Sequence, residues 1–292
     1  MFIKLKHVLF FCFLFCCLPL CLHGQKSALE DYEFIKYLIG NDMKDNALTW
    51  AKREFTDTYY QKEAWDSIHF IRGWAFYSNK ILDSASLSFD RVKNISLKPA
   101  AVFFSSLCLA YNRENNKSIR KLLANKNVIH THKELYSFEM AGYSLLKRDF
   151  LSYQTYGQDF TYSSYILADK EKELDSIYTI LREGKIKSPL FAAALSAIIP
   201  GLGKIYLGNL GEGISSFITV GVFSSICAEN WIKHGFYNWK TILFGSLASI
   251  FYVGNIYGSY FGVKLSTDEF NNNQNLNILY NIHIPLRNTF GL

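Results

Sequence analysis

The sequence is short of charge. Asp, Glu, Lys and Arg make up 19% of its 292 residues, against roughly 25% in a typical soluble domain. The shortage lies in residues 190–262, which contain only these charged residues: Lys204, Glu212, Glu229, Lys233 and Lys240. Such a distribution excludes a disordered chain and argues against a wholly soluble protein. It predicts a polar domain followed by a membrane module.

Motifs for catalysis are also missing. The chain has no His-Glu-x-x-His sequence, phosphate loop or nucleophile elbow, and no strand precedes Gly201-Leu-Gly203 to make a dinucleotide fingerprint. His130, His132 and Glu134 lie close in sequence, but a solvated loop entering a helix explains them better than a metal site. We therefore expect no enzyme, and no catalytic, cofactor-binding or metal-binding residues.

Cysteine is scarce beyond the N-terminal apolar run, where only Cys108 and Cys227 remain. One lies in each predicted region, so a disulfide between them is not expected. Both are predicted to be apolar filling of a core. The net charge of +6 is too small to indicate nucleic acid as a partner.

The N-terminus has the pattern of a secretory signal peptide. Lys4 and Lys6 precede an uncharged apolar run over residues 8–22, and the small residue Gly24 follows. The run is short for a membrane span of about 20 residues. Cleavage after Gly24 is predicted; an uncleaved anchor and a lipoprotein processed at Cys21 are the alternatives.

Residues 26–187 show helical periodicity and little strand alternation. The expected helical segments pair into hairpins and end in a capping helix: Ala28–Gly40 with the segment around Trp50, 73–92, Ala100–Arg113 with Ser118–Ala124, Lys133–Leu146 with Phe150–Phe160, and Asp169–Glu183. Eight tyrosines suggest either a tyrosine-lined binding face or, preferably, core packing: Tyr59, Tyr60, Tyr136, Tyr143, Tyr153, Tyr156, Tyr162 and Tyr165.

One hairpin carries a known spacing. Gly73, Phe76, Ala85 and Phe89 follow one another at the offsets of the 34-residue tetratricopeptide (TPR) pattern, in which small residues allow two helices to cross closely and aromatic rings fill the groove beside them. This stretch resembles a TPR repeat, and Gly142 occupies the close-packing position of a later hairpin. The resemblance implies an array of four degenerate repeats with a concave surface for a protein or peptide.

Three apolar stretches follow: Leu190–Leu207, Gly213–Ala228 and Thr241–Val263. The first is broken at Pro200, so neighbouring helices must satisfy the freed backbone groups. Gly254, Gly258 and Gly262 form a ladder that lets another helix approach, within the chain or in a homodimer. Asn255 at membrane depth is expected to find a backbone group freed at Pro200.

A second resemblance rests on residues 188–208, 213–217 and 251–258. They include Ser196, Pro200, Gly201, Gly203 and Tyr206, and look like the C-terminal domain of a bacterial family of uncharacterised exported membrane proteins with a Ser-x-x-x-Pro-Gly-x-Gly-Gln-x-Tyr signature. The signature is also similar to that of the two-transmembrane-segment domain. The resemblance implies a helical membrane domain preceded by TPR repeats, and no particular activity. Lys204 replaces the usual glutamine.

The predicted fold is all-α, a TPR-like hairpin array followed by a module of two or three membrane helices. The expected divisions are a signal peptide (1–24), the repeat domain (25–187), the membrane domain (188–270) and a polar tail (271–292) whose asparagines end the last helix. We expect a scaffold in the bacterial inner membrane with its repeat domain in the periplasm. Its partners would be the bilayer and a protein or peptide bound by residues 26–187; a homo-oligomeric transporter or channel subunit is the alternative.

Overall fold

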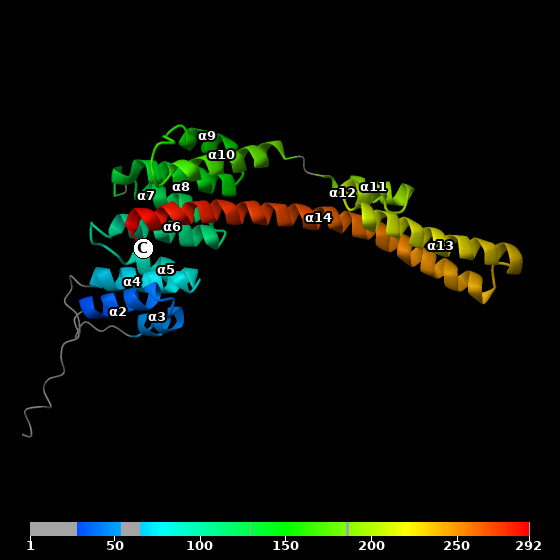
Figure 1. The fold of residues 1–292 in the computed structure, drawn as a ribbon, viewed down its shortest axis with the longest axis horizontal. Coiled ribbons are helices and arrows are strands. Elements are labelled where there is room, and N and C mark those ends of the chain that lie inside the picture. Colours follow the sequence, from blue (N-terminus) through cyan, green and yellow to red (C-terminus); the bar gives the residue numbers. More distant parts are fainter. Residues whose placement is uncertain (1–27, 54–64, 129, 185–186, 292) are drawn as a thin grey trace, which may run out of the picture. The chain divides into compact units, whose positions relative to one another are not determined.

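The structure, a computed structural model, describes residues 28–53, 65–128, 130–184 and 187–291 (Figure 1). Every regular element in these residues is helical, with thirteen α-helices and one short 3-10 helix. The all-helical prediction is therefore confirmed. The predicted signal peptide lies outside the described residues. Contacts divide the chain into two compact units: the hairpin unit, up to Lys170 together with Ile282–Leu292, and the apolar unit, Glu171–Asn281.

The hairpin unit is built from short helices that pack against their neighbours in chain order. They are α2 (Ala28–Gly40), α3 (Lys44–Ala51), α4 (Trp65–Ser78), α5 (Leu82–Asp90), α6 (Lys98–Tyr111), α7 (Asn115–Ala124), η3 (His130–His132), α8 (Lys133–Leu146) and α9 (Phe150–Gly157). The periodicity places most of these helices to within a few residues, because each has an apolar face that its neighbour covers.

The same turn joins the two helices of each hairpin. A residue with positive φ follows the first helix at Asp42, Lys80, Arg113 and Arg148, at intervals of 38, 33 and 35 residues. After α4, for example, the Ile81 amide donates to the Phe76 carbonyl and the Lys80 amide to the Tyr77 carbonyl, both at 2.9 Å. This pair of bonds is the Schellman motif, which satisfies the last carbonyls of a helix. The chain thus repeats one helical hairpin four times.

The predicted packing residues of the hairpins lie in the core. A Cβ atom on Gly73 would lie 2.7 Å from the Phe89 ring, so α4 and α5 cross closely at this glycine. Phe76, Ala85 and Phe89 are buried in the same pair of helices. Gly142 is buried in α8.

The apolar unit contains most of α10 (Ala168–Glu183) and the helices that follow it. Its helices are α10, α11 (Pro189–Ile198), α12 (Leu202–Leu207), α13 (Leu210–His234) and α14 (Trp239–Phe290), of which α10 begins and α14 ends in residues of the hairpin unit. Only α13 and α14, among the described residues, are long and apolar enough to cross a membrane. The first apolar stretch is divided into α11 and α12 at Pro200, as predicted.

The expected end of the last helix at the asparagines is wrong. Helix α14 continues through residues 271–277 to Phe290, and Pro285 lies inside it. Asparagine is a modest helix former that tertiary contacts can override. Beyond the asparagines, Ile282, Leu286 and Phe290 are four residues apart and share one face of the helix. Residues 282–292 are thus part of the hairpin unit and not a separate polar tail.

Candidate functional site

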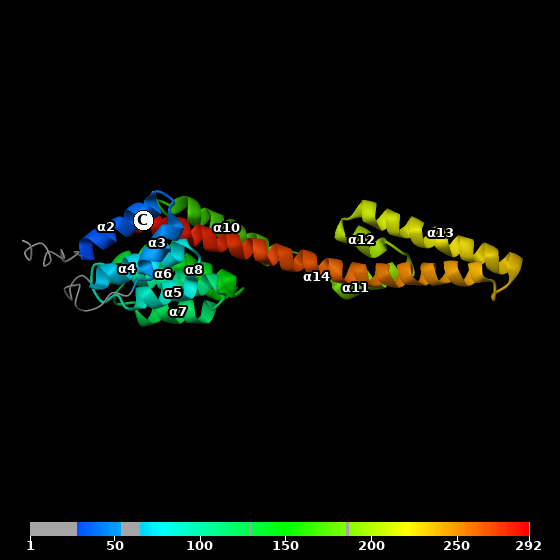
Figure 2. The same cartoon turned by 90° about the horizontal axis from the view of Figure 1, so that it is seen from below.

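The hairpin unit presents an aromatic face, made of Trp74 and Tyr77 on α4, Phe103 and Phe104 on α6, and His132 on η3. The C-terminal segment, Ile282–Phe290 of α14, lies against this face (Figures 1 and 2). Both belong to the same compact unit. A helix of the chain itself therefore covers this face.

His283, Arg287 and Phe290 of this segment lie against aromatic rings of the face. The Phe290 ring centroid lies 5.2 Å from that of His132 and 6.0 Å from that of Phe103. The Arg287 guanidinium lies 5.6 Å from the centroid of Trp74, within the range of a cation–π interaction. The segment is thus held by aromatic packing and by one cation.

A polar contact between Tyr77 and His283 also helps to hold the segment. The Tyr77 hydroxyl lies 2.6 Å from His283 Nδ1. Burial, together with the nearby positive charge of Arg287, lowers the pKa of His283 to about 4. The imidazole is therefore neutral at pH 7, and its Nδ1 can accept the Tyr77 proton. Burial also raises the pKa of Tyr77, which keeps that hydroxyl a donor.

Apolar burial also stabilises the docked segment. Ile282 and Leu286 both have an exposed fraction of 0%. Fully burying one such side chain contributes about 1.5–3 kcal/mol. An amphipathic helix that places residues at i, i+4 and i+8 on a complementary surface is a common mode of peptide recognition. The sequence reasoning missed these residues, although their four-residue spacing was a signal for them.

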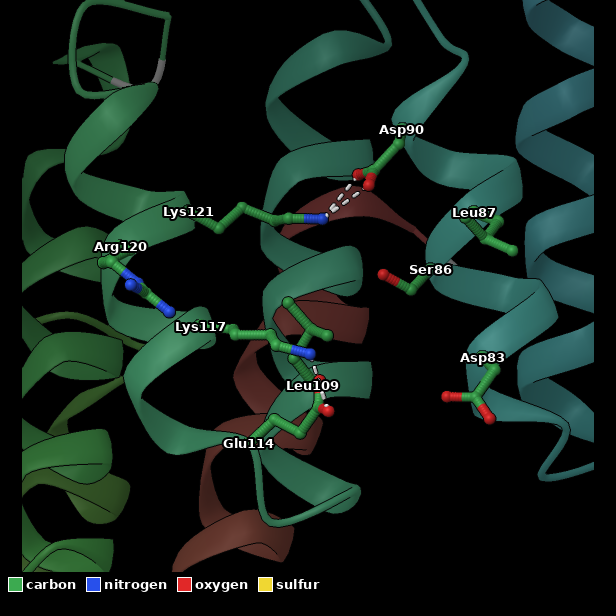
Figure 3. Close-up of a pocket in the computed structure, with 9 residues that line it drawn as sticks. All are labelled: Asp83, Ser86, Leu87, Asp90, Leu109, Glu114, Lys117, Arg120 and Lys121. Carbon is green, nitrogen blue, oxygen red and sulfur yellow. Dashed lines mark hydrogen bonds and ion pairs between the residues drawn. The ribbon is translucent and has the colours of Figure 1, made fainter.

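Apart from the aromatic face, the hairpin unit has a depression among α5, α6 and α7, with a volume of about 540 Å³ (Figure 3). Lys121 pairs with Asp90 at 2.6 Å and Lys117 with Glu114 at 2.8 Å. Lys121 also donates to Ser105 at 2.6 Å. Because these opposite charges neutralise one another, the depression has no charge of one sign to attract a ligand. Its polar groups connect neighbouring hairpins.

Glu139 on α8 is a completely buried acid of the hairpin unit. Its Oε2 atom accepts hydrogen bonds from the Tyr143 hydroxyl at 2.8 Å and the Ser106 hydroxyl at 3.1 Å. Burial raises the pKa of Glu139 to about 8, and the two hydrogen bonds only partly oppose this shift. The carboxyl group is therefore protonated at neutral pH. It joins α8 to Ser106 on α6 within the core.

This acid predicts a pH-dependent stability. In the unfolded chain Glu139 ionises near its ordinary pKa of 4.5, whereas in the folded chain it stays protonated up to about pH 8. The free energy of unfolding should therefore fall as the pH rises from 5 to 8. Glu139→Gln should remove this slope and be more stable at pH 8 by on the order of 4 kcal/mol. Hydrogen exchange of α6 and α8 measures the difference.

Glu33→Gln, at an exposed position of α2, is the matched control and should keep the wild-type slope. Equal slopes in the wild type and in Glu139→Gln would contradict a protonated Glu139 in the core.

In the apolar unit, the Ser-x-x-x-Pro-Gly-x-Gly residues close a tight corner between α11 and α12. The Ser196 hydroxyl accepts the Gly203 amide at 3.0 Å and lies 2.6 Å from the Ser259 hydroxyl on α14. A Cβ on Gly203 would lie 2.1 Å from the Ala192 carbonyl oxygen. Gly201 has φ 91°, and a Cβ there would lie 2.0 Å from the Gly213 carbonyl oxygen. Both positions therefore require glycine.

Helix α14 supplies the hydrogen bonds that the proline break leaves open. Pro200 has no amide proton to donate to the Ser196 carbonyl, and the Asn255 side-chain amide lies 3.5 Å from that oxygen. The Tyr252 hydroxyl donates to the next carbonyl, of Ala197, at 2.7 Å. The predicted partner of Asn255 is thus confirmed. Tyr206, the last residue of the signature, packs its ring against that of Phe191 at a steep angle, with centroids 5.3 Å apart.

The glycine ladder of α14 is only partly covered within the chain. A Cβ on Gly258 would lie 3.8 Å from Lys204 Cε, and one on Gly262 would lie 3.4 Å from Leu207 Cδ1. Gly254 has nothing within 4 Å of its Cβ position among the described residues. Two of the three glycines thus face the short helix α12, while homodimerisation through the ladder stays a prediction.

Of the other residues singled out from the sequence, some are buried and others are exposed. Tyr136, Tyr143 and Tyr153 are buried, whereas Tyr162 and Tyr165 are exposed; Tyr59 and Tyr60 lie outside the described residues. Cys108 is buried and Cys227 half-buried, and both are free thiols. Within the described part of the chain, no group of three or more His, Cys, Asp or Glu side chains could hold a metal ion.

Comparison with known proteins adds nothing to this geometry. No protein-family model, no curated protein and no solved structure matches the chain.

Proposed function

We propose that the protein is a membrane-anchored scaffold of the bacterial cell envelope whose aromatic face binds an amphipathic helix of a partner protein. The observation that carries the proposal is the C-terminal segment on that face. A surface that buries Ile282 and Leu286 completely and offers rings to Phe290 has the shape and chemistry for a helix. The TPR resemblance supports the same role for the hairpin array.

The apolar unit supports the anchoring role. Helices α13 and α14 are long and apolar enough to cross a bilayer. Large apolar side chains on them are exposed, including Phe217, Ile218, Val222, Ile250 and Phe261. Exposed apolar surface on this scale is unfavourable in water and favourable against lipid. The signal-peptide pattern of residues 1–24 supports a periplasmic location for the hairpin array.

In this proposal the C-terminal segment competes with the partner. A partner helix would need apolar residues at i, i+4 and i+8 and would replace Ile282, Leu286 and Phe290. While it is docked, the segment lowers the apparent affinity of the aromatic face for other helices. A competing helix must displace the segment, and this displacement costs part of the competitor's binding free energy.

Photo-crosslinking in cells tests this role. A crosslinking residue at position 111, where the Tyr111 ring lies beside Tyr77 with centroids 6.4 Å apart, should capture a partner more strongly in the Leu286→Asp chain than in the wild type, because the aromatic face is then free. An excess of a synthetic peptide with the sequence of residues 278–291 should abolish the capture in membranes. Capture that the peptide leaves unchanged would overturn the proposed face.

A crosslinking residue at position 165, which is fully exposed, is the matched control and should not capture the same partner. Protease treatment of spheroplasts tests the location separately. Cleavage within the hairpin unit only after lysis would contradict the periplasmic placement.

A further inference from the structure

A pocket of about 410 Å³ lies inside the apolar unit, among α12, α13 and α14. Its polar side chains come from Lys204 on α12, from Ser215, Ser216 and Thr219 on α13, and from Asn255 on α14. Val220 and Phe251 are among its apolar lining residues. The pocket therefore gathers a cation, hydroxyls and an amide within a module whose outer surface is apolar.

The polar groups of the pocket are not all used within the chain. Asn255 is 5% exposed, and its Oδ1 atom has no hydrogen-bond partner among the described residues. Its amide nitrogen is already directed to the Ser196 carbonyl. Leaving a buried acceptor without a donor costs about 1–3 kcal/mol. An occupant that donates a hydrogen bond to Oδ1 would remove this cost.

The donors in the pocket favour an anion. Lys204 carries the only charge among the lining residues, and it is positive. Its stem lies against α14, with Cε 3.8 Å from the Cβ position of Gly258. The Ser215 and Ser216 hydroxyls add two neutral donors to the same pocket. An ammonium with two hydroxyls is a suitable set of donors for a phosphate group.

The length of α13 places the pocket near one membrane surface. Its 25 residues span about 37 Å at 1.5 Å per residue, which exceeds a hydrocarbon core of about 30 Å. Trp231 and Lys233 lie at the C-terminal end of α13, where aromatic and basic residues are typical of a membrane interface. Ser215 and Ser216, near the other end, then lie at the opposite boundary between headgroups and acyl chains.

From these observations we propose that the pocket binds the headgroup of an anionic glycerophospholipid. Its phosphate is bound by Lys204 and the hydroxyls of Ser215 and Ser216. A headgroup hydroxyl, as in phosphatidylglycerol, donates to Asn255 Oδ1, and an acyl chain follows Val220 and Phe251. The inference rests on the membrane location proposed above.

Lipid retention measures this binding. The full chain is reconstituted in nanodiscs of equal parts phosphatidylglycerol and phosphatidylcholine, released from them, and examined by native mass spectrometry. The wild type should retain phosphatidylglycerol in preference, and Lys204→Gln should reduce the preference about fivefold, as expected for one lysine near a lipid phosphate. A double change of Ser215→Ala and Ser216→Ala should reduce it too, and it provides a test if Lys204→Gln does not fold.

Lys240→Gln is the matched control, because Lys240 begins α14 at the other end of the module. It should retain the wild-type preference. An unchanged preference in Lys204→Gln, or an equal loss in Lys240→Gln, would overturn the site. Displacement of the lipid by excess glycerol 3-phosphate would overturn the choice of a lipid and assign the pocket to a soluble phosphate. Complete extraction of the chain from cell membranes by alkaline carbonate would instead contradict the membrane location.

Discussion

Gly203→Ala should unfold the corner between α11 and α12. The added Cβ would lie 2.1 Å from the Ala192 carbonyl oxygen, 2.5 Å from Ser196 Oγ and 2.7 Å from Ser259 Cβ. These atoms surround the glycine on several sides, and one of them is backbone, so no rotation of a flexible side chain can make room. Overpacking of this kind costs roughly 3 kcal/mol or more. The change would also displace the Gly203 amide from Ser196 Oγ.

The loss should be confined to the apolar unit. In detergent, hydrogen exchange should accelerate in α11 and α12 but stay at the wild-type level in α6 and α8. Gly211→Ala is the matched control, because a Cβ there meets nothing within 4 Å; it should be neutral or stabilising by about 0.5–1 kcal/mol. If α11 and α12 exchanged hydrogen at the wild-type rate in the Gly203→Ala chain, close packing around Gly203 would not be what holds the corner together.

Part of this corner could be predicted from the sequence. A proline inside an apolar helix frees a known carbonyl, so a nearby buried amide such as Asn255 has an identifiable partner. The contributions of Ser259 and Tyr252 could not be predicted, because they depend on the rotation of α14 about its axis. The pocket beside Asn255 was missed for the same reason: α14 completes a lining that begins on α12 and α13.

In the hairpin unit, helical periodicity was sufficient where each helix buries one face against its neighbour. Ala28–Gly40 and Lys133–Leu146 were predicted with the bounds of α2 and α8. Periodicity failed at the end of α14, where an asparagine-rich stretch and Pro285 both weaken the local helical signal. The contacts of Leu286 and Phe290 with helices more than 150 residues earlier in the sequence stabilise that helix, and no local pattern reports them.

Leu286→Asp should release the C-terminal segment from the aromatic face. Leu286 is completely buried there, so the change removes about 1.5–3 kcal/mol of apolar burial and adds the cost of desolvating a carboxylate. Undocking is the less costly outcome, because it returns the aspartate to water. Protection of residues 282–290 from hydrogen exchange should fall about 100-fold or more, which corresponds to roughly 3 kcal/mol.

Leu276→Asp makes the same chemical change on the same helix, at a side chain that is 59% exposed. It should leave the protection of residues 282–290 within a factor of about two, since surface substitutions usually change stability by less than 0.5 kcal/mol. If both variants lost protection equally, the acidic residue would be weakening α14 itself, and the buried contact of Leu286 would not explain the docking.

Docking should also weaken in acid, through His283. Its pKa is about 4 when docked and near 6.5 when the segment is free, so the free state binds more protons between these values. Docking is therefore strongest above pH 6.5 and weakens as the pH falls towards 4. Because the imidazole is partly open to solvent, we expect about a tenfold loss of protection, corrected for intrinsic exchange. His283→Gln, which cannot gain a proton, should lose this dependence, whereas a wild-type protection factor equal at pH 7 and pH 4 would show that His283 does not control the docking.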